Sequence, residues 1–428
     1  MHTVCTSSIF PGVNLTCVKT DKFKTGCLYV YLIGGLRRET AASSALLMRV
    51  LRRGSKELPD MEHISAALDE LYGARLEPIT RKKGELHCIG FYADFPDDVF
   101  IPGGGSVLEK TISLTCGMLL SPDLSGGLLR GDYVESEKKN LIDDIKARIN
   151  DKRGYAIDRL LEEMCAGEPF SVNRLGGEDE ARVITPAALT AHYSGLIADS
   201  RIELFYCGAA EPQRVESALR AALSGFTDRS GAEMPTTGVI LYPQESPPRR
   251  FTESLDVSQG KLAAGFRLGK AMTDIPDYAA LTVFNAVYGS GVTSKLFLNV
   301  REKLSLCYYA GSVIDKHKGI MIVSSGVDFS NFDVALDEIL AQLGHVKSGE
   351  VSDWELKSAK RSVITAIKSA LDTPSGLTGL YFDSSISPVR YDPVGLCDKV
   401  EAVTLDHVVE TASEIEPDAI FFLTGIDS

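Results

Sequence analysis

Long apolar runs and local metal or redox motifs are missing from this sequence of 428 residues. No stretch approaches the roughly 18 uninterrupted apolar residues of a membrane-spanning helix, so we expect none. The amino-terminal residues lack the basic region and apolar core of a secretory signal. The nine cysteines form no C-x-x-C pair, which predicts free thiols in a reducing cytoplasm. None of the seven histidines lies three or four residues from another, so no helix is expected to carry a local pair of metal-binding imidazoles.

The charge balance is acidic, with a formal net charge of -13. An excess of carboxylates repels phosphate groups, so the composition argues against nucleic acid and anionic membranes as partners. Charged residues make up 24% and hydrophobic residues 44% of the chain, which is typical of a globular protein with an ample core. A chain of this length is expected to hold about two to four domains.

Several familiar catalytic patterns are also absent. The glycine-bearing segment 289–297 lacks the G-x-x-x-x-G-K-[ST] spacing and follows a predicted helix rather than a strand, so we interpret it as a helix–helix turn. There is no G-x-S-x-G and no cysteine with a local catalytic signature. The acids that follow Asp132 alternate with lysines and arginines, which is typical of a solvated helix face.

The order of predicted elements repeats after roughly 235 residues. Lys83-Gly84 precedes an apolar strand that leads to Asp94-Phe95, and Lys318-Gly319 precedes one that leads to Asp328-Phe329. In the first half we expect strands at 26–35, 74–81, 85–93 and 202–207, with helices at 40–52, 61–72, 132–165 and 212–223. In the second half we expect strands at 261–268, 308–313, 319–325 and 419–424, with helices at 277–288, 293–304, 331–347, 352–382 and 404–415.

A linker is predicted between the two copies. Residues 226–250 are rich in Pro, Gly, Ser and Thr and show no sustained apolar period. The predicted domains are therefore 1–225 and 251–428, joined by 226–250. Mixed strands with helices to one side predict an α+β sandwich in each half. Pro374 is expected to kink or break the helical stretch that contains it.

One stretch of the second half has a specific pattern. The segment from Gly291 to Tyr308 reads G-V-T-S-K-L-F-L-N-V-R-E-K-L-S-L-C-Y and passes from a helix into a strand. This stretch resembles the G-x-x-S-[RK]-L-F-x-x-[VL]-R-E-x-x-x-L-x-Y pattern of the pitrilysin/insulinase/mitochondrial-processing-peptidase family. The resemblance extends over nearly the whole chain in element order, and it is closest to the non-zinc, peptidase-like members of that family.

The resemblance implies a fold of two homologous α/β sandwich domains of the LuxS/MPP-like metallohydrolase type that close like a clamshell. It places Ala45, Met48 and Arg49 where zinc-bearing members carry H-x-x-E-H. It also places Asp144, seven residues after Glu137, where the third zinc ligand would stand. Alanine and methionine are poor zinc ligands, and an arginine cation repels Zn²⁺. We therefore expect no metal site and no catalytic residues in this chain.

The Arg and Tyr of the matching stretch are retained as Arg301 and Tyr308. In the family, residues at these positions hold the scissile peptide and its developing oxyanion. A guanidinium and a phenol can both donate to a carbonyl oxygen, so the implied substrate-binding role is chemically sensible.

Two functional hypotheses follow. In the first, the chain is an inactive, cytoplasmic, peptidase-like subunit that pairs with a zinc-bearing homologue and supplies Arg301 and Tyr308 for peptide processing. No activity is then expected from the chain alone, zinc is expected only in the partner subunit, and a homodimer is the alternative assembly when the partner is absent. In the second, the chain is a purely structural or peptide-binding assembly protein of the same fold. A stand-alone peptidase that uses another metal cluster is a third, weaker reading.

Overall fold

Two compact units make up the chain. The computed structural model describes residues 2–226, 233–270, 275–387 and 389–426. Unit 1 comprises Met1–Lys146, Val172–Thr236 and Leu371–Phe382, and unit 2 comprises Ala147–Ser171, Thr237–Ala370 and Asp383–Ser428. These units are assembled from non-contiguous segments, so they do not coincide with the contiguous ranges 1–225 and 251–428 expected from the sequence. Residues 227–232 of the expected linker lie outside the described residues.

The sheet of unit 1 has the strand order β1-β2-β8-β3-β5-β4. Its strands are β1 (Thr3–Phe10), β2 (Val13–Lys19), β3 (Thr25–Gly35), β4 (Arg75–Lys83), β5 (Leu86–Pro96) and β8 (Arg201–Gly208). Neighbouring strands are antiparallel except β2 and β8, which run parallel. Strands β3, β4, β5 and β8 were predicted from the sequence. Strands β1 and β2 were not, because alternation is weak in both and threonine and serine are frequent in β1.

Helices cover both faces of this sheet. The helices of unit 1 are α1 (Arg38–Leu51), α2 (Met61–Glu70), α3 (Val107–Leu120), α4 (Gly131–Ala147), α6 (Glu178–Arg182), α7 (Pro186–Asp199) and α8 (Pro212–Ala222). On β3, Leu28, Val30 and Leu32 alternate toward the core beneath these helices. The intervening Tyr31 points the other way and stacks on Phe382 at 4.2 Å between ring centroids. Phe382 belongs to α12 (Pro374–Ile386), whose first part lies in unit 1.

The sheet of unit 2 has the strand order β11-β12-β10-β13-β9. Its strands are β9 (Arg249–Leu255), β10 (Gly260–Arg267), β11 (Cys307–Asp315), β12 (Ile320–Val327) and β13 (Glu416–Gly425). The pair β13–β9 is parallel and the other pairs are antiparallel, which reproduces the arrangement β4-β5-β3-β8-β2 of unit 1. Because β3 begins at residue 25 and β10 at residue 260, the offset is 260 − 25 = 235, and the predicted internal repeat is confirmed.

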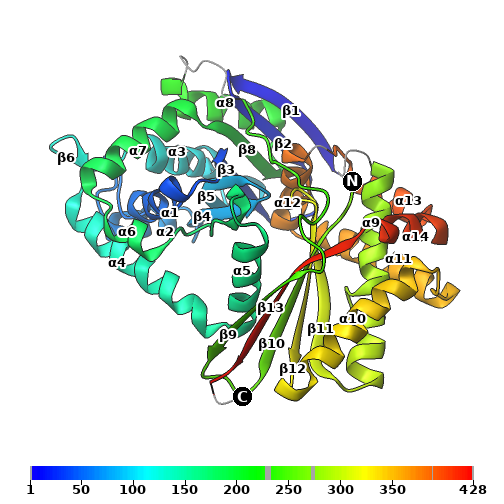
Figure 1. Ribbon diagram of the computed structural model, residues 1–428. Helices are drawn as coiled ribbons and strands as arrows, with labels where there is room; N and C mark the ends of the chain where they lie inside the picture. The colour runs from blue at the N-terminus through cyan, green and yellow to red at the C-terminus, as the bar shows by residue number, and fades with distance from the viewer. Residues whose placement is uncertain (1, 227–232, 271–274, 388, 427–428) are drawn as a thin grey trace. The chain divides into compact units, whose positions relative to one another are not determined.

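Unit 2 also carries helices on both faces of its sheet (Figure 1). One face is covered by α9 (Ile275–Tyr288), α10 (Phe332–Lys347), α11 (Asp353–Ala370), α13 (Pro393–Glu401) and α14 (Leu405–Ser413). The other face is covered by α5 (Lys152–Met164), which packs on β10 and β13. A side chain at Gly265 of β10 would meet Met164 Sδ at 2.3 Å, so glycine permits this close packing of helix on sheet.

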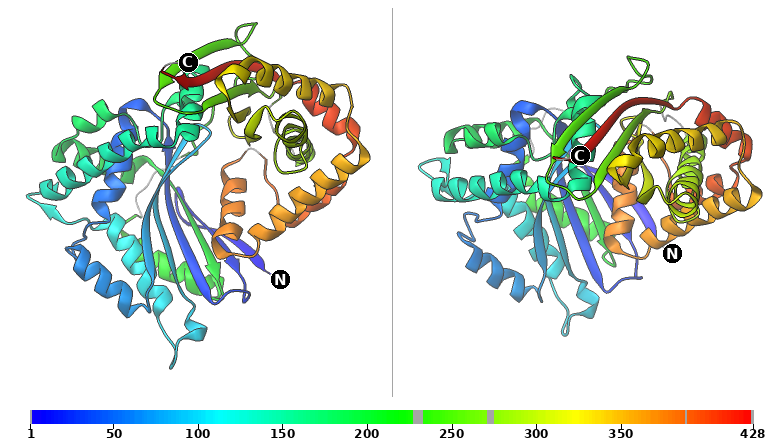
Figure 2. Two further views of the ribbon diagram at one scale, coloured as in Figure 1. Left: turned by 90° about the horizontal axis from the view of Figure 1, so that it is seen from below. Right: turned by 60° about the horizontal axis from the view of Figure 1, so that its bottom comes forward.

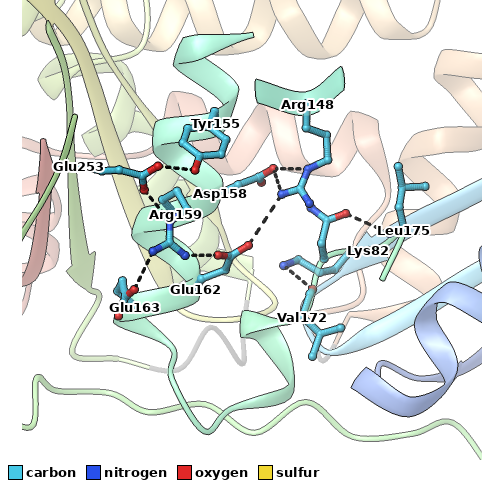
Figure 3. Close-up of polar contacts among 11 residues, drawn as sticks. Lys82, Arg148, Tyr155, Asp158, Arg159, Glu162, Glu163, Val172, Leu175 and Glu253 are labelled. Atoms are coloured by element: carbon cyan, nitrogen blue, oxygen red, sulfur yellow. Dashed lines mark hydrogen bonds and ion pairs between the residues drawn. The ribbon is translucent and has the colours of Figure 1, made fainter. Parts of the chain in front are cut away.

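Ion pairs reinforce the contact of α5 with the edge strand β9 (Figure 3). Arg159 Nε lies 3.1 Å from Glu253 Oε2, and the Tyr155 hydroxyl donates to Glu253 Oε1 at 2.6 Å. The other guanidinium nitrogens of Arg159 contact Glu162 at 2.5 Å and Glu163 at 3.1 Å. The acids of α5 are thus ion-paired. Among the acids after Asp132 that were predicted on a solvated face, Glu137 is instead nearly buried, with its side chain 11% exposed.

Some predicted helices differ in detail. The expected helix 132–165 is two helices, α4 and α5, separated by a 3₁₀ turn (Arg148–Asn150), because Asp151 leaves the helical conformation and caps α5 through Gly154 N–H. The expected break at Pro374 is confirmed, since α11 ends at Ala370 and Pro374 begins α12. Helices α3, α6, α7 and α13 and strand β9 were not predicted from the sequence. The short elements β6 (Leu124–Ser125), β7 (Leu128–Leu129), η1 (Asp98–Phe100), η3 (Pro169–Ser171), η4 (Ser224–Phe226) and η6 (Phe329–Asn331) complete the chain.

Two further observations concern the thiols and the helices. All nine cysteines are unpaired, and seven of them are buried. Within the described residues, no helix has the length and apolar character that crossing a membrane requires. The two views of Figure 2 show the same strands and helices from other directions.

Candidate functional site

Helix α1 carries the positions that would hold zinc in a metallopeptidase of this fold. Its sequence, rich in alanine and leucine, favours a helix strongly, and nine of its fourteen residues are buried. Ala45 and Met48 have 1% and 0% exposure and belong to the hydrophobic core of unit 1. Their side chains contribute packing at these positions and offer no nitrogen or oxygen ligand.

Arg49, one residue further along α1, points toward α4. Its Nη2 lies 2.7 Å from Asp144 Oδ2, and the two residues are 95 positions apart in the sequence. The Arg49 side chain is 23% exposed and that of Asp144 is 57% exposed. The residue expected at a metal-ligand position on one helix is therefore ion-paired with the residue expected at the third ligand position on another.

A second arginine engages the other acid of the pair. Arg53 Nη1 lies 3.0 Å from Glu137 Oε1, and Asn140 Nδ2 donates to Glu137 Oε2 at 3.2 Å. The Glu137 side chain is only 11% exposed, so these contacts compensate a carboxylate that is largely removed from water. The carboxylates of Glu137 and Asp144 are thus each paired with an arginine, Asp144 with one from α1 and Glu137 with one just after it.

This arrangement does not fit a zinc ion. Zinc sites in proteins use thiolate, imidazole and carboxylate ligands, and only Asp144 and Glu137 are of that kind here. Both carboxylates contact guanidinium groups, which supply the positive charge that a metal would otherwise bring. Within the described residues, no group of three or more His, Cys, Asp and Glu side chains could hold a metal ion.

Arg301 lies in an unusual helix of unit 2. Leu296–Lys303, labelled η5, is a π-helix rather than the expected α-helix, and the Leu304 N–H donates to Asn299 O at 3.1 Å. Such segments are rare and are frequent at functional sites. The Arg301 side chain is 41% exposed, its Nε lies 3.5 Å from Glu302 Oε1, and its Cζ stacks 4.7 Å from the centroid of the Phe297 ring. The guanidinium is therefore positioned by its own helix and remains accessible.

Tyr308 lies near the start of the edge strand β11. The register with β12 slips between Cys307 and Tyr309, so Tyr308 is the extra residue of a β-bulge. A bulge re-aims the side chain it carries, and Tyr308 is 65% exposed whereas Cys307 is buried. In the described part of the chain, β11 pairs only with β12. Its outer backbone groups are therefore open to another extended segment.

A short turn connects the two predicted binding residues. Between η5 and β11 the chain passes through Ser305, which has φ of +51°, a left-handed conformation that non-glycine residues rarely adopt. Arg301 and Tyr308 thus flank one constrained turn of unit 2. Glu137, Asp144 and the former ligand positions of α1 lie in unit 1.

A cation–π contact that was not predicted from the sequence lies next to this turn. The Arg153 guanidinium of α5 lies 4.3 Å from the centroid of the Tyr309 ring, and its Nε donates to Ser324 Oγ at 3.2 Å. The other side of the ring lies against Gly326, where a Cβ would meet Tyr309 Cε1 at 2.6 Å. Burial raises the pKa of Tyr309 to about 12. No local pattern joins Arg153 to Tyr309, since only the packing of α5 on this sheet brings them together.

A family described as "Peptidase M16 inactive domain" matches residues 184–363. Among curated proteins, the "Probable inactive metalloprotease YmfF" of Bacillus subtilis strain 168 is 32% identical over 419 residues, which cover 97% of this chain and 96% of that protein.

Two solved structures show the same fold. A "conserved protein from Enterococcus faecalis V583" superposes with a TM-score of 0.88 at 26% identity and covers 99% of both chains. The "peptidase M16 inactive domain from Pseudomonas fluorescens" superposes with a TM-score of 0.80 at 16% identity, covering 99% of this chain and 98% of that one. The fold predicted from the sequence, two homologous units of strands and helices, is the fold of these structures.

Proposed function

Because the chain belongs to the M16 peptidase family and is an inactive metalloprotease homologue, we propose that it acts as the non-catalytic subunit of a peptide-processing pair. In this proposal the partner is a homologous chain that carries H-x-x-E-H and its zinc. This chain contributes Arg301, Tyr308 and the edge of β11. Both chains act in the cytoplasm, as the composition predicts.

The observation that carries the proposal is an asymmetry between the two units. At the former zinc positions, charge is cancelled internally by Arg49 and Asp144. In unit 2, by contrast, Arg301 and Tyr308 remain exposed beside an open strand edge. The Arg301 side chain is 41% exposed and Tyr308 is 65% exposed, so both hydrogen-bond donors keep their access to solvent.

The proposed roles follow from the chemistry of each group. An extended peptide would add to β11 through backbone hydrogen bonds, which fix its register without restricting its sequence. The Arg301 guanidinium and the Tyr308 hydroxyl would donate to the scissile carbonyl oxygen as negative charge develops on it. The general base and the metal that activate water belong to the partner in this proposal, so no chemical step is assigned to residues of α1.

The test is co-expression with an H-x-x-E-H homologue from the same genome, followed by cleavage assays on a fluorogenic peptide library. Arg301→Ala and Tyr308→Phe should each lower kcat by about 10²-fold, the usual effect of losing one oxyanion donor, while the pair still co-elutes. The matched controls Arg361→Ala and Tyr72→Phe change exposed residues elsewhere and should leave cleavage unchanged.

Unchanged cleavage in Arg301→Ala and Tyr308→Phe, with the pair intact, would remove the substrate-binding role. It would favour the alternative in which this fold serves assembly alone. Absence of any complex with the zinc-bearing homologue would remove the pairing itself.

A further inference from the structure

A cavity of about 380 Å³ opens in unit 1 where β3 ends and β5 begins, beneath α1 and α7. It is lined by Gly34 and Gly35 of β3, Ser44 of α1, His87 of β5, and His192 and Gly195 of α7. Neither the Arg49–Asp144 pair nor the Arg301–Tyr308 turn contributes to it. Its volume lies in the range of pockets that hold small organic ligands.

The cavity arises where a core-facing row of β5 changes character. Phe95, Phe91 and Ile89 alternate toward the core of unit 1, and His87 is the next residue in that row. Directly across the ladder stands Gly34, which has no side chain to fill the space. A Cβ built on Gly34 would have no atom within 4 Å, and the same holds for Gly195 in α7. The opening thus follows from glycines facing a histidine.

His87, a residue of the cavity wall, carries a buried hydrogen-bonding atom that is not used. Its side chain has 4% exposure, and its Nε2 has no hydrogen-bond partner among the described residues. Burial lowers the pKa of the imidazole to about 4. A hydrogen bond with the backbone of Arg174 acts in the opposite direction, since it favours the protonated ring, but its effect is smaller. The ring is therefore neutral at pH 7. With its single N–H directed to the Arg174 backbone, Nε2 is left as an acceptor.

Other polar groups surround the cavity. Ser44 Oγ lies 2.9 Å from His192 Nε2, and burial lowers the pKa of that imidazole, so this pair is also neutral. The charged residues at the wall are Arg37, Asp199 and Glu233, all exposed, which gives two carboxylates and one guanidinium. Neither Arg37 nor Asp199 forms an ion pair within the described part of the chain. The wall thus combines neutral acceptors inside with an excess of negative charge outside.

We propose that this cavity binds a small molecule with a primary ammonium group, of the free amino acid or short peptide class. An ammonium or amide N–H of the ligand donates to His87 Nε2, and the carboxylates of Asp199 and Glu233 favour the positive charge. Arg37 offers a counter-charge for a ligand carboxylate. The backbone of Gly34 and Gly35 allows close approach of the ligand.

The first experiment measures binding of the twenty amino acids and a set of glycyl dipeptides to the full chain by ligand-observed NMR and calorimetry. At least one compound should bind with Kd below about 1 mM, which is weak small-molecule binding. Its N-acetylated derivative should bind at least tenfold more weakly, because acetylation removes the ammonium charge. If no compound binds, or if acetylation leaves Kd unchanged, the proposal is wrong.

A pair of glycine variants locates the binding. Gly195→Leu places a side chain into the cavity from α7 without meeting a neighbouring atom at its Cβ, so it should weaken binding at least tenfold. Gly117→Leu makes the same change on α3, where a Cβ also has open space but lies outside the cavity, and binding should be unchanged. Equal affinity in the two variants would place the ligand elsewhere and overturn the assignment.

His87→Leu tests the acceptor. It places an apolar side chain of similar bulk in the core row. It should weaken binding about tenfold, because the ligand donor is left unpaired. In the wild type, the ¹⁵N resonance of His87 Nε2 should shift when the ligand is added. A ligand that binds without moving this resonance does not use His87, and that outcome would contradict the proposed contact.

Discussion

Arg49 Nη2 and Asp144 Oδ2 lie 2.7 Å apart, and the two residues come from different helices of unit 1. The family resemblance implies a histidine and a glutamate at these two positions in zinc-bearing members. Here a guanidinium and a carboxylate bind each other directly. The charges of this pair therefore balance without a metal ion.

Restoring the ligand set should restore metal binding because α1 and α4 still approach closely enough for direct contact. We expect the quadruple variant Ala45→His, Met48→Glu, Arg49→His and Asp144→Glu to gain about 2.7 kcal/mol of stability at a zinc concentration 100 times Kd. The measurement is Tm with and without zinc. The triple variant that retains Arg49 is the control and should show no zinc effect. An equal response of the two variants would contradict the alignment.

Without zinc the same variant should be less stable than the wild type. Met48 has 0% exposure, so Met48→Glu alone removes a core side chain and buries a carboxylate. We expect a loss of about 3 kcal/mol or more in free energy of unfolding. Urea denaturation at neutral pH checks this. The volume-conserving Met48→Leu should cost less than about 1.5 kcal/mol.

A buried ion network in unit 2 should be sensitive to the loss of one member. Arg267 is 3% exposed, and it contacts Asp418 at 2.8 Å and Glu168 at 2.7 Å. Arg267→Met should cost about 3–5 kcal/mol because it leaves Asp418 buried with reduced compensation. The double variant Arg267→Met with Asp418→Leu should cost less than the sum of the single changes. Additive costs in a double-mutant cycle would contradict the coupling.

An exposed pair provides the comparison for that network. Arg182 and Glu178 lie four residues apart on α6, with side chains 52% and 32% exposed. Arg182→Ala should change the free energy of unfolding by no more than about 0.5 kcal/mol. The contrast separates the effect of burial from the effect of pairing.

Lowering the pH should reduce the stability of the protein because of His87. Burial lowers its folded-state pKa to about 4, below the ordinary value of 6.5, so the unfolded chain binds more protons between these values. The stabilising contribution is complete above pH 6.5 and is lost as pH falls toward 4, on the order of 3 kcal/mol in total. The wild type should therefore lose more stability over this window than His87→Leu, as measured by urea denaturation. Parallel curves would contradict a buried neutral imidazole.

Thiol labelling should distinguish the cysteines by burial. Cys5 is exposed, whereas burial raises the pKa of Cys27, Cys88 and Cys116 to about 12 and keeps them protonated. In native protein the fastest reaction with a chromogenic disulfide should come from Cys5 and vanish in Cys5→Ser, and the half-buried Cys397 should react next. In denatured protein all nine cysteines should react. Several fast thiols in the native state would indicate that the cores of the units open readily.

Much of the fold could be predicted because local pattern reflects burial. The continuous apolar run of β3 and the 235-residue offset between β3 and β10 could be read from the apolar pattern and the internal repeat. Strands β1 and β2 were missed because their alternation is weak. The π-helix η5 was expected as an α-helix because apolar spacing over eight residues does not separate the two.

Part of the candidate site could likewise be predicted from the sequence, and part could not. From the sequence, Ala45, Met48 and Arg49 could be recognised as residue types that are poor zinc ligands, and the motif that contains Arg301 and Tyr308 could also be recognised. The exposure of those two side chains, the bulge that turns Tyr308 outward and the left-handed Ser305 needed coordinates. Turn conformation and strand register depend on pairing with β12, which a local pattern does not encode.

By itself, the sequence determined that α1 lacks the ligands for a metal and that the chain contains two copies of one unit. Tertiary structure alone decided that Arg49 meets Asp144 and that His87 faces the space left by Gly34. The physical reason is one of range. Ligand chemistry and side-chain periodicity are properties of a few neighbouring residues, whereas the partner of a buried or charged group is fixed by the packing of elements far apart in the chain.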